Sequence, residues 1–343
     1  MTDAQSTLMF AEAASAASVL EEQRRRNRAV VSQLGERLRA TRPTAVLTCA
    51  RGSSDHAATF ARYLIETRAG VLTSSQAPSI ASVYDSQPQT GRSLCIAISQ
   101  SGKSPDILAA ASAARQSGAH LLALVNVEDS PLAQLADTVL PLCAGKETSV
   151  AATKSYIAAL AAIVDLVAEW TEDQVLAEAL EQAPDLLRRS WEADWSPLSA
   201  GLNDVSGLFV IGRGPGLGIA QEAALKFKET CGIHAEAFSA AEVLHGPIAL
   251  AGPDFPLLVF RQSDESAESI DSLVREVASR GGKLFVAGPT VDGAVHLPVQ
   301  QAHAAIEPML QIQSFYRAVN ALALARGFNP DQPRNLRKVT ETV

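Results

Sequence analysis

Short apolar runs alternate with helical stretches along most of this chain, starting at Thr44. The runs in its first half are TAVLTCA (44–50), SLCIAIS (93–99), HLLALVNV (120–127) and TVLPL (138–142). The stretches between them, such as 55–68 and the one that starts at Ser104, favour helix. Continuous apolar strands separated by helices are typical of a parallel sheet covered on both faces. The pattern therefore predicts an α/β fold, preceded by a helix over residues 1–40.

The second half of the chain repeats this order of motifs at a nearly constant separation. The strand end LTCARG (47–52) has a counterpart in FVIGRG (209–214), 162 residues later. The turn SQSGKS (99–104) corresponds to RQSDES (261–266) at the same offset, and GAHLLAL corresponds to GGKLFVA at 163. Repeats of this size indicate a duplicated domain and not the short period of a solenoid. We therefore predict two copies of one α/β domain, joined by a helical connector around residues 170–200.

Composition and charge exclude several classes of protein. The 343 residues suffice for about two domains, and 47% hydrophobic with 19% charged residues is typical of a globular chain. A net charge of −8 argues against a nucleic-acid or membrane-surface binder. No apolar stretch is long enough to span a membrane, and Asp3 and Glu12 interrupt the N-terminal segment, so we expect neither a transmembrane helix nor a signal peptide. The four cysteines form no CxxC pair, and Cys49 and Cys95 lie in apolar runs, so we expect buried thiols in a soluble, cytoplasmic protein.

The segment EAALKFKE (222–229) places charged side chains on one face of a predicted helix. Glu222, Lys226 and Glu229 are separated by four and then three residues, so their side chains stack above one another. His234 and His245 follow, the latter in a His-Gly-Pro turn. Converging acid, amine and imidazole groups are what proton transfer on a small anionic molecule needs. The alternative is a solvated helix with ordinary ion pairs.

The turn SQSGKS, between a buried strand and a helix, is a candidate phosphate site. A helix N-terminus binds anions through its backbone N–H groups and its dipole, and Gly102 allows close backbone approach. The alternative is a simple N-cap turn, since serine is a common cap. Further hydroxyls at the end of the neighbouring strand favour phosphate, because ligands bind at the open ends of parallel strands. The candidate residues are Ser53, Ser54, Ser99, Gln100, Ser101 and Ser104.

Other motifs argue against a cofactor. The glycines of GRGPGLG (212–218) fall at every second position, which does not fit the GxGxxG of dinucleotide-binding proteins. No HxxxH, CxxC or carboxylate cluster favours a metal. We therefore expect neither a cofactor nor a metal. The polar C-terminal segment DQPRNLRKVTETV is either a frayed tail or the source of an active-site lysine.

Taken together, these motifs resemble the sugar-isomerase (SIS) superfamily, specifically the isomerase half of glutamine–fructose-6-phosphate amidotransferase. The resemblance covers nearly the whole chain, through RGSS, SQSGKS, SVAATK, EAALKFKE, IHAEAFSAAEVLHGP and DQPRNLRK. It implies two tandem flavodoxin-like SIS domains, each a mostly parallel sheet between helices, which act on a sugar phosphate without a metal or nucleotide cofactor. We expect an N-terminal helix plus first domain over 1–180, a second domain over 181–327 and an active-site tail over 328–343.

Carried over by position, the resemblance also implies roles for individual residues. The phosphate cradle would consist of Ser54, Ser99, Gln100, Ser101 and Ser104. Val150 and Ala152 would contact the sugar.

The catalytic residues implied by the resemblance include the charged helix face. Glu229 would move a proton between C1 and C2 of the sugar, with Lys226 and Glu222 as its partners. His245 would open the sugar ring, reaching in from the second subunit of a homodimer. Lys338 would form a Schiff base with the open-chain keto sugar.

Departures from the family pattern shape the expected reaction. Residue 2 is Thr, so we expect no amidotransferase domain before the sugar domains, and free ammonia, or the reverse reaction, in place of glutamine. Lys103 stands where the family usually has an acid, and Ala152 replaces a serine. The pattern is similar to SIS-type glucosamine-6-phosphate deaminases, which convert glucosamine 6-phosphate and water into fructose 6-phosphate and ammonia.

Two alternatives to the deaminase stay open. Similar scaffolds serve as phosphosugar ketose/aldose isomerases and as fructosamine-6-phosphate deglycases. A non-catalytic sugar-phosphate-binding regulator is the other alternative, although residues 1–40 are short for a DNA-binding module. Each candidate binds a hexose or hexosamine 6-phosphate, and neither a nucleic acid nor a membrane is an expected partner.

Overall fold

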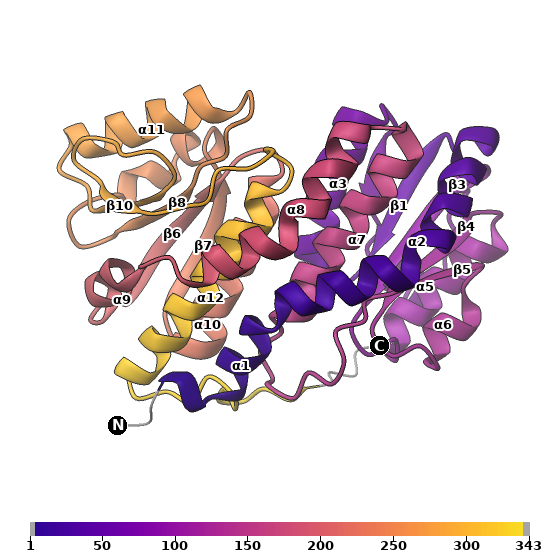
Figure 1. The fold of residues 1–343 in the computed structure, drawn as a ribbon, viewed down its shortest axis with the longest axis horizontal. Helices are drawn as coiled ribbons and strands as arrows, with labels where there is room; N and C mark the ends of the chain where they lie inside the picture. The colour runs from indigo at the N-terminus through magenta and orange to yellow at the C-terminus, as the bar shows by residue number, and fades with distance from the viewer. Residues whose placement is uncertain (1–3, 339–343) are drawn as a thin grey trace. The chain divides into compact units, whose positions relative to one another are not determined.

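The computed structural model describes residues 4–338, which form two compact units with one β-sheet each (Figure 1). The first-sheet unit consists, within the described residues, of 18–147, 154–181 and 337–338. The second-sheet unit consists of 4–17, 148–153 and 182–336. The predicted domain boundaries stay a prediction, and residues 339–343 of the predicted tail lie outside the described residues.

The first sheet is parallel throughout, as the apolar runs predict. Its strands are β1 (Ala45–Cys49), β2 (Thr73–Ser75), β3 (Ser93–Ser99), β4 (His120–Val125) and β5 (Thr138–Pro141). They are ordered β2-β1-β3-β4-β5, with parallel pairing between all neighbours. The sequence pattern missed β2, because two of its three residues are exposed at the sheet edge and form no apolar run.

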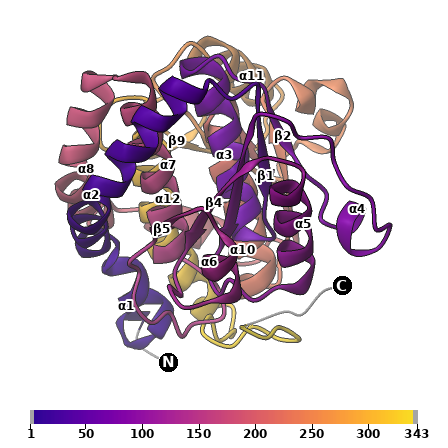
Figure 2. The same ribbon diagram turned by 90° about the vertical axis from the view of Figure 1, so that its right-hand side faces the viewer.

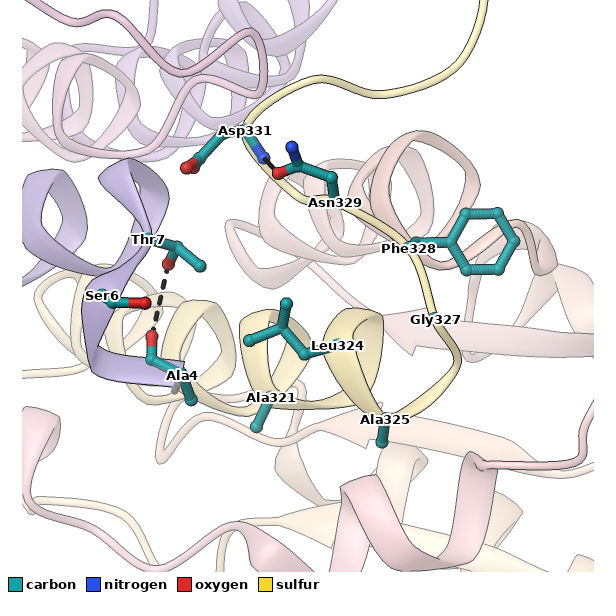
Figure 3. A pocket seen from close by; sticks show the side chains of 10 residues that line it. All are labelled: Ala4, Ser6, Thr7, Ala321, Leu324, Ala325, Gly327, Phe328, Asn329 and Asp331. Carbon is teal, nitrogen blue, oxygen red and sulfur yellow. Dashed lines mark hydrogen bonds between the residues drawn. The ribbon is translucent and has the colours of Figure 1, made fainter. Parts of the chain in front are cut away.

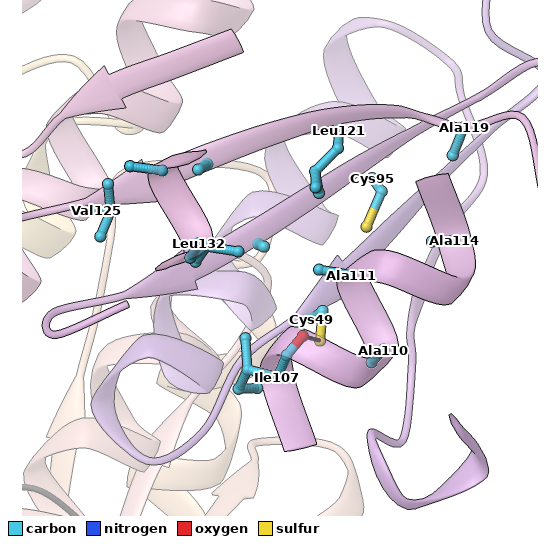
Figure 4. Close-up of a cluster of buried hydrophobic side chains, with 13 residues drawn as sticks. Cys49, Cys95, Ile107, Ala110, Ala111, Ala114, Ala119, Leu121, Val125 and Leu132 are labelled. Carbon is cyan, nitrogen blue, oxygen red and sulfur yellow. Dashed lines mark hydrogen bonds between the residues drawn. The ribbon is translucent and has the colours of Figure 1, made fainter. Parts of the chain in front are cut away.

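Helices cover both faces of this sheet (Figure 2). They are α2 (Ala16–Thr41), α3 (Ser53–Arg68), α4 (Ser79–Ser82), α5 (Pro105–Gln116), α6 (Pro131–Leu135) and α7 (Lys154–Thr171). Along β3, Cys95 and Ala97 face a core built with α5 and α6 (Figure 4), while the alternate residues Leu94 and Ile96 are equally buried. Burial on both faces explains why β3 reads as a continuous apolar run. The prediction of buried Cys49 and Cys95 side chains is confirmed.

The second sheet has the same topology as the first. Its strands are β6 (Gly207–Gly212), β7 (His234–Ser239), β8 (Leu257–Phe260), β9 (Leu284–Ala287) and β10 (Val295–Leu297). They are ordered β10-β9-β8-β6-β7, and all pairs are parallel. Read from its β7 edge, the second sheet has the order β7-β6-β8-β9-β10, which corresponds to β2-β1-β3-β4-β5 in the first. Both sheets thus place their second strand outside the first, which is the flavodoxin-like order. The predicted duplication is therefore confirmed.

Two helices cover one face of the second sheet and one covers the other. The elements of this unit are η1 (Ala4–Ser6), α1 (Leu8–Ala14), α9 (Ser196–Leu202), α10 (Gly216–Cys231), η2 (Glu242–His245), η3 (Pro247–Leu250), α11 (Ala267–Ser279) and α12 (Glu307–Ala325). Phe227 of α10 meets Phe315 of α12 with ring centroids 5.1 Å apart, and α11 packs Leu273 and Val274 into the opposite core. The predicted helical connector consists of α8 (Gln174–Trp191) and α9.

A helix that crosses a membrane needs about 20 apolar residues. Between residues 4 and 338, none of the helices meets that requirement for length and hydropathy.

Candidate active site

The charged face of α10 forms a compact array of three side chains. The Lys226 ammonium (Nζ) lies 2.6 Å from Oε2 of Glu229 and 3.3 Å from Oε1 of Glu222. The side chains of Glu222 and Lys226 are 0% and 1% exposed, whereas that of Glu229 is 18% exposed. A solvated helix with surface ion pairs is therefore excluded here. Glu229 is the member of the array that reaches towards the surface.

Neighbouring groups stabilise the Lys226 ammonium and hold Glu222 in place. The Tyr316 hydroxyl, from α12, donates a hydrogen bond of 3.0 Å to Oε1 of Glu222. Burial by itself lowers the pKa of Lys226, but the Glu222 and Glu229 carboxylates outweigh it and hold this pKa above its ordinary value. The array therefore presents a fixed positive charge beside a partly exposed carboxylate. Such an arrangement suits proton transfer at a carbon next to a carbonyl group.

The turn SQSGKS begins at the last residue of β3 and leads into α5. Oγ of Ser99 accepts a hydrogen bond of 3.0 Å from the backbone N–H of Gly102, and Oγ of Ser101 accepts one of 3.4 Å from Lys103. Gly102 has φ +64°, and a Cβ there would lie 2.2 Å from Oγ of Ser130. The turn therefore requires glycine at this position. Ser104 stands at the N-cap of α5 without a capping bond from its side chain, which weakens the simple N-cap interpretation.

The second set of serines lies next to this turn in the same sheet. Ser53 and Ser54 open α3 directly after β1. Because β1 and β3 are parallel neighbours, both turns lie at the C-terminal ends of the strands. Nε of Arg51 donates a hydrogen bond of 2.9 Å to the fully buried Asp106 carboxylate at the start of α5. This ion pair connects the two turns. The hydroxyl and amide groups predicted for the phosphate cradle thus lie at the C-terminal ends of two neighbouring strands.

The corresponding turn of the second copy binds a carboxylate of the protein itself. Ser263 donates to Glu307 twice, from its backbone N–H at 2.7 Å and from its hydroxyl at 2.8 Å. Glu307 opens α12 and is 7% exposed; burial raises its pKa, and the bonds from Ser263 oppose that effect. Because these donors already hold an anion, the first copy provides the candidate phosphate site. The motif comparison did not reveal this difference, since Glu307 lies 44 residues from Ser263.

Val150 and Ala152, the predicted sugar contacts, lie in a loop between β5 and α7 that belongs to the second-sheet unit. The buried Glu12 carboxylate of α1 accepts hydrogen bonds from the backbone N–H groups of Thr148 and Ser149. The Val150 N–H donates to the carbonyl of Asp331 at 3.2 Å. This loop is therefore fixed through its backbone, by groups distant in sequence. Sequence reasoning missed Glu12, which no local motif marks.

Lys338 contacts a carboxylate that the sequence analysis did not single out. Nζ of Lys338 donates to Oε2 of Glu147 at 3.4 Å, and both residues belong to the first-sheet unit. The Glu147 side chain is 0% exposed and that of Lys338 is 26% exposed. The C-terminal segment up to Lys338 is thus held by a buried charge.

His245 does not lie beside the charged array within one chain. Helix α10 begins at the C-terminal ends of the strands, just after β6, and runs back along the sheet. Glu229, near the C-terminus of α10, therefore lies towards the N-terminal ends of the strands. His245 ends η2, which follows the end of β7, and is exposed together with Leu244 and Leu250. His234 opens β7 at the other end of the strand and is exposed. Of the groups expected to converge, the carboxylates and the Lys226 amine thus lie together within one chain, whereas the imidazoles do not join them.

The cavity shown in Figure 3 is separate from the predicted catalytic residues. It has a volume of about 690 Å³ and is lined by the N-terminal segment and the end of α12, including Thr7, Phe328 and Asp331. None of the predicted site residues lines it. In the described part of the chain, no group of three or more His, Cys, Asp or Glu side chains is placed to hold a metal ion.

Two flavodoxin-like sheets in tandem define a duplicated, doubly wound α/β protein. Residues 42–168 and 201–287 match the model of the SIS domain family, and each matched segment contains strands of one sheet. The chain belongs to the SIS domain family, which confirms the resemblance seen in its motifs.

Known relatives agree with this assignment. The isomerizing glutamine–fructose-6-phosphate aminotransferase of Legionella pneumophila (strain Lens) is 37% identical over 302 residues, which make up 84% of this chain and 49% of that protein. A protein from Silicibacter pomeroyi DSS-3, provisionally named a phosphosugar isomerase, superposes with a TM-score of 0.91 at 39% identity, over 95% of this chain and 100% of that one.

The C-terminal domain of glucosamine-fructose-6-phosphate aminotransferase from Francisella tularensis superposes with a TM-score of 0.86 at 27% identity, over 97% of this chain and all of that one. The chain spans about half the length of the curated relatives that it matches. The similarity thus concerns the sugar-isomerase half of the aminotransferases.

Proposed function

We propose that the protein is an amino-sugar phosphate deaminase/isomerase that converts glucosamine 6-phosphate and water into fructose 6-phosphate and ammonia. The observation that carries the proposal is the buried Glu222–Lys226–Glu229 array, with only Glu229 partly exposed. Burying three charges is costly unless they serve one another or a ligand. The same residues stand at matching positions in the family motif EAALKFKE.

The reaction needs one proton to move between neighbouring carbons. After ring opening, the Glu229 carboxylate removes the proton from C2 and returns it to C1. A second proton passes from the amine nitrogen to the C1 oxygen, which gives the imine of fructose 6-phosphate. Lys226 holds Glu229 at 2.6 Å and supplies positive charge while negative charge develops on the substrate. Water then adds to C2 and ammonia leaves, so the atoms balance.

The phosphate group is the second recognition element of the proposal. The hydroxyls and the amide at the C-terminal ends of β1 and β3 supply neutral donors, and the α5 N-terminus supplies a favourable dipole. Lys103 of the turn is exposed and can add one positive charge. The SQSGKS turn belongs to the first-sheet unit and the Glu222–Lys226–Glu229 array to the second-sheet unit. The proposal gives each of them a necessary role, so a variant of either one is expected to abolish turnover.

The direct test is to incubate the purified protein with glucosamine 6-phosphate and to measure ammonia and fructose 6-phosphate. Glu229→Gln is expected to abolish proton exchange at C1/C2, measured in deuterated water, while phosphate binding stays nearly intact. Exchange that persists in this variant would remove Glu229 from the mechanism. No turnover of any hexosamine 6-phosphate by the wild type would refute the proposal.

A homodimer with shared active sites is part of the proposal. His245 is exposed, stands away from Glu229 in its own chain, and is flanked by the exposed Leu244 and Leu250. Mixing Glu229→Gln and His245→Ala proteins is therefore expected to recover activity, because a mixed dimer retains one site with both groups intact. No recovery despite demonstrated subunit exchange contradicts shared sites.

A substrate panel separates the deaminase from its alternatives. Gluco and galacto hexosamine phosphates, ketose phosphates and fructosamine 6-phosphate identify a ketose/aldose isomerase or a deglycase by their own products. Thermal stabilisation by a sugar phosphate with no turnover in the whole panel indicates a regulator. The cytoplasmic location stays a prediction.

A further inference from the structure

Glu147 is a buried carboxylate whose two oxygens both accept hydrogen bonds. It lies between β5 and α7, and its side chain is 0% exposed. Oε1 accepts a hydrogen bond of 3.2 Å from the backbone N–H of Ser155, and Oε2 accepts one of 2.6 Å from the Ser155 hydroxyl. Ser155 is the second residue of α7, so the positive end of the helix dipole also faces this carboxylate. These contacts hold the Glu147 carboxylate in one position.

The same carboxylate oxygen also binds Lys338. Nζ of Lys338 lies 3.4 Å from Oε2 of Glu147, although the two residues are 191 positions apart. Lys338 keeps 26% of its side chain exposed, so the side chain contacts a buried base and still reaches the surface. A lysine that attacks a carbonyl carbon must be accessible and must first lose a proton. This geometry meets both requirements.

We propose that Glu147 positions Lys338 and accepts its proton when the lysine attacks C2 of the open-chain keto sugar, a step that rests on the proposed function. The Lys338 ammonium gives one proton to Glu147, and the free amine bonds to C2. The carbonyl oxygen leaves as water, with one proton returned from Glu147 and one taken from nitrogen. The product is a protonated Schiff base, so one proton remains on nitrogen. No oxidant or reductant takes part.

The test measures how fast the Schiff base forms. Wild-type protein is incubated with fructose 6-phosphate and sodium borohydride, which reduces the imine to a stable secondary amine that peptide mass spectrometry locates. We expect modification of Lys338 in the wild type and none at this position in Lys338→Met. Glu147→Gln keeps the shape and a hydrogen-bond acceptor but cannot take the proton. Its trapping rate is expected to fall by about a hundredfold, while the affinity for inorganic phosphate stays unchanged.

Glu147→Asp is the conservative control, because it keeps the carboxylate but withdraws it from the lysine by one methylene. We expect its trapping rate to lie between those of the wild type and Glu147→Gln. A merely structural role predicts instead that phosphate affinity and trapping fall together.

Trapping at the wild-type rate in folded Glu147→Gln overturns the proposal. If that variant does not fold, an unchanged rate in folded Glu147→Asp overturns it as well. If the wild type traps sugar but the Glu147 variants do not differ from it, only the role of Glu147 fails. A wild type that neither traps sugar nor releases ammonia refutes the proposed function, and the role of Glu147 with it.

Discussion

Replacing Lys226 by methionine is the most informative perturbation of this protein. Methionine has a similar length and fills the space of the lysine, but it removes the ammonium between Glu222 and Glu229. Glu229 is partly exposed and can be solvated, whereas the Glu222 side chain is 0% exposed. The variant therefore leaves a buried carboxylate without its counter-ion, so the cost falls mainly on Glu222.

The expected loss follows from the burial of the pair. Removing one partner of a buried ion pair costs about 3–5 kcal/mol, because the remaining charge stays desolvated. For a unit of this size, about 1 kcal/mol shifts the midpoint of thermal unfolding by about 2–4 °C. Lys226→Met is therefore expected to lower the midpoint of the second-sheet unit by about 6–20 °C. The pKa of Lys226 is raised, so its contribution is fully present at neutral pH and is lost only as the pH rises through the elevated pKa.

Scanning calorimetry at pH 7.5 measures this shift, and a double variant tests its cause. Glu222→Gln/Lys226→Met removes the stranded charge but keeps an oxygen that can accept from the Tyr316 hydroxyl. We expect it to recover at least half of the lost stability, since replacing a whole buried ion pair is often nearly neutral. A midpoint within about 2 °C of the wild type for Lys226→Met, or no recovery in the double variant, refutes the reasoning.

Two further predictions concern the first-sheet unit. Gly102→Ala is expected to weaken phosphate binding by about tenfold or more, because its Cβ would lie 2.2 Å from Oγ of Ser130. Gly91→Ala is the control, since Gly91 also has positive φ but no atom within 4 Å of an added Cβ; isothermal titration with phosphate that shows equal effects contradicts the clash. Burial raises the pKa of Asp165 to about 6 from an ordinary 3.8, against the attraction of Arg24, so its contribution to stability falls as the pH rises from about 4 to about 6. Above pH 6, Asp165→Asn is thus expected to raise the free energy of unfolding by up to about 3 kcal/mol, measured by denaturant titration. Below pH 4 we expect no difference from the wild type, and equal unfolding curves at pH 8 disprove the effect of burial.

The sequence by itself determined the features that local spacing encodes. Continuous apolar runs identified β1, β3, β4 and β5. The run is clearest for β3, which is buried at every position, because a strand buried on both faces needs apolar side chains throughout. The constant offset between motifs gave the duplication, which the identical strand order confirms. The spacing of Glu222, Lys226 and Glu229 predicted their stacking, since helix geometry fixes which side chains meet.

Only the tertiary structure decided which groups are buried and which distant partners they have. It buried Lys226 and brought Tyr316, 94 positions from Glu222, to the same array. It brought Glu147 to Lys338 and filled the Ser263 turn with Glu307. The edge strand β2 also stayed hidden in the sequence, because two of its three residues are exposed and it forms no apolar run. Periodicity shows which face of an element is apolar or charged, but the partner of that face is set by chain topology, which brings together residues that share no local pattern.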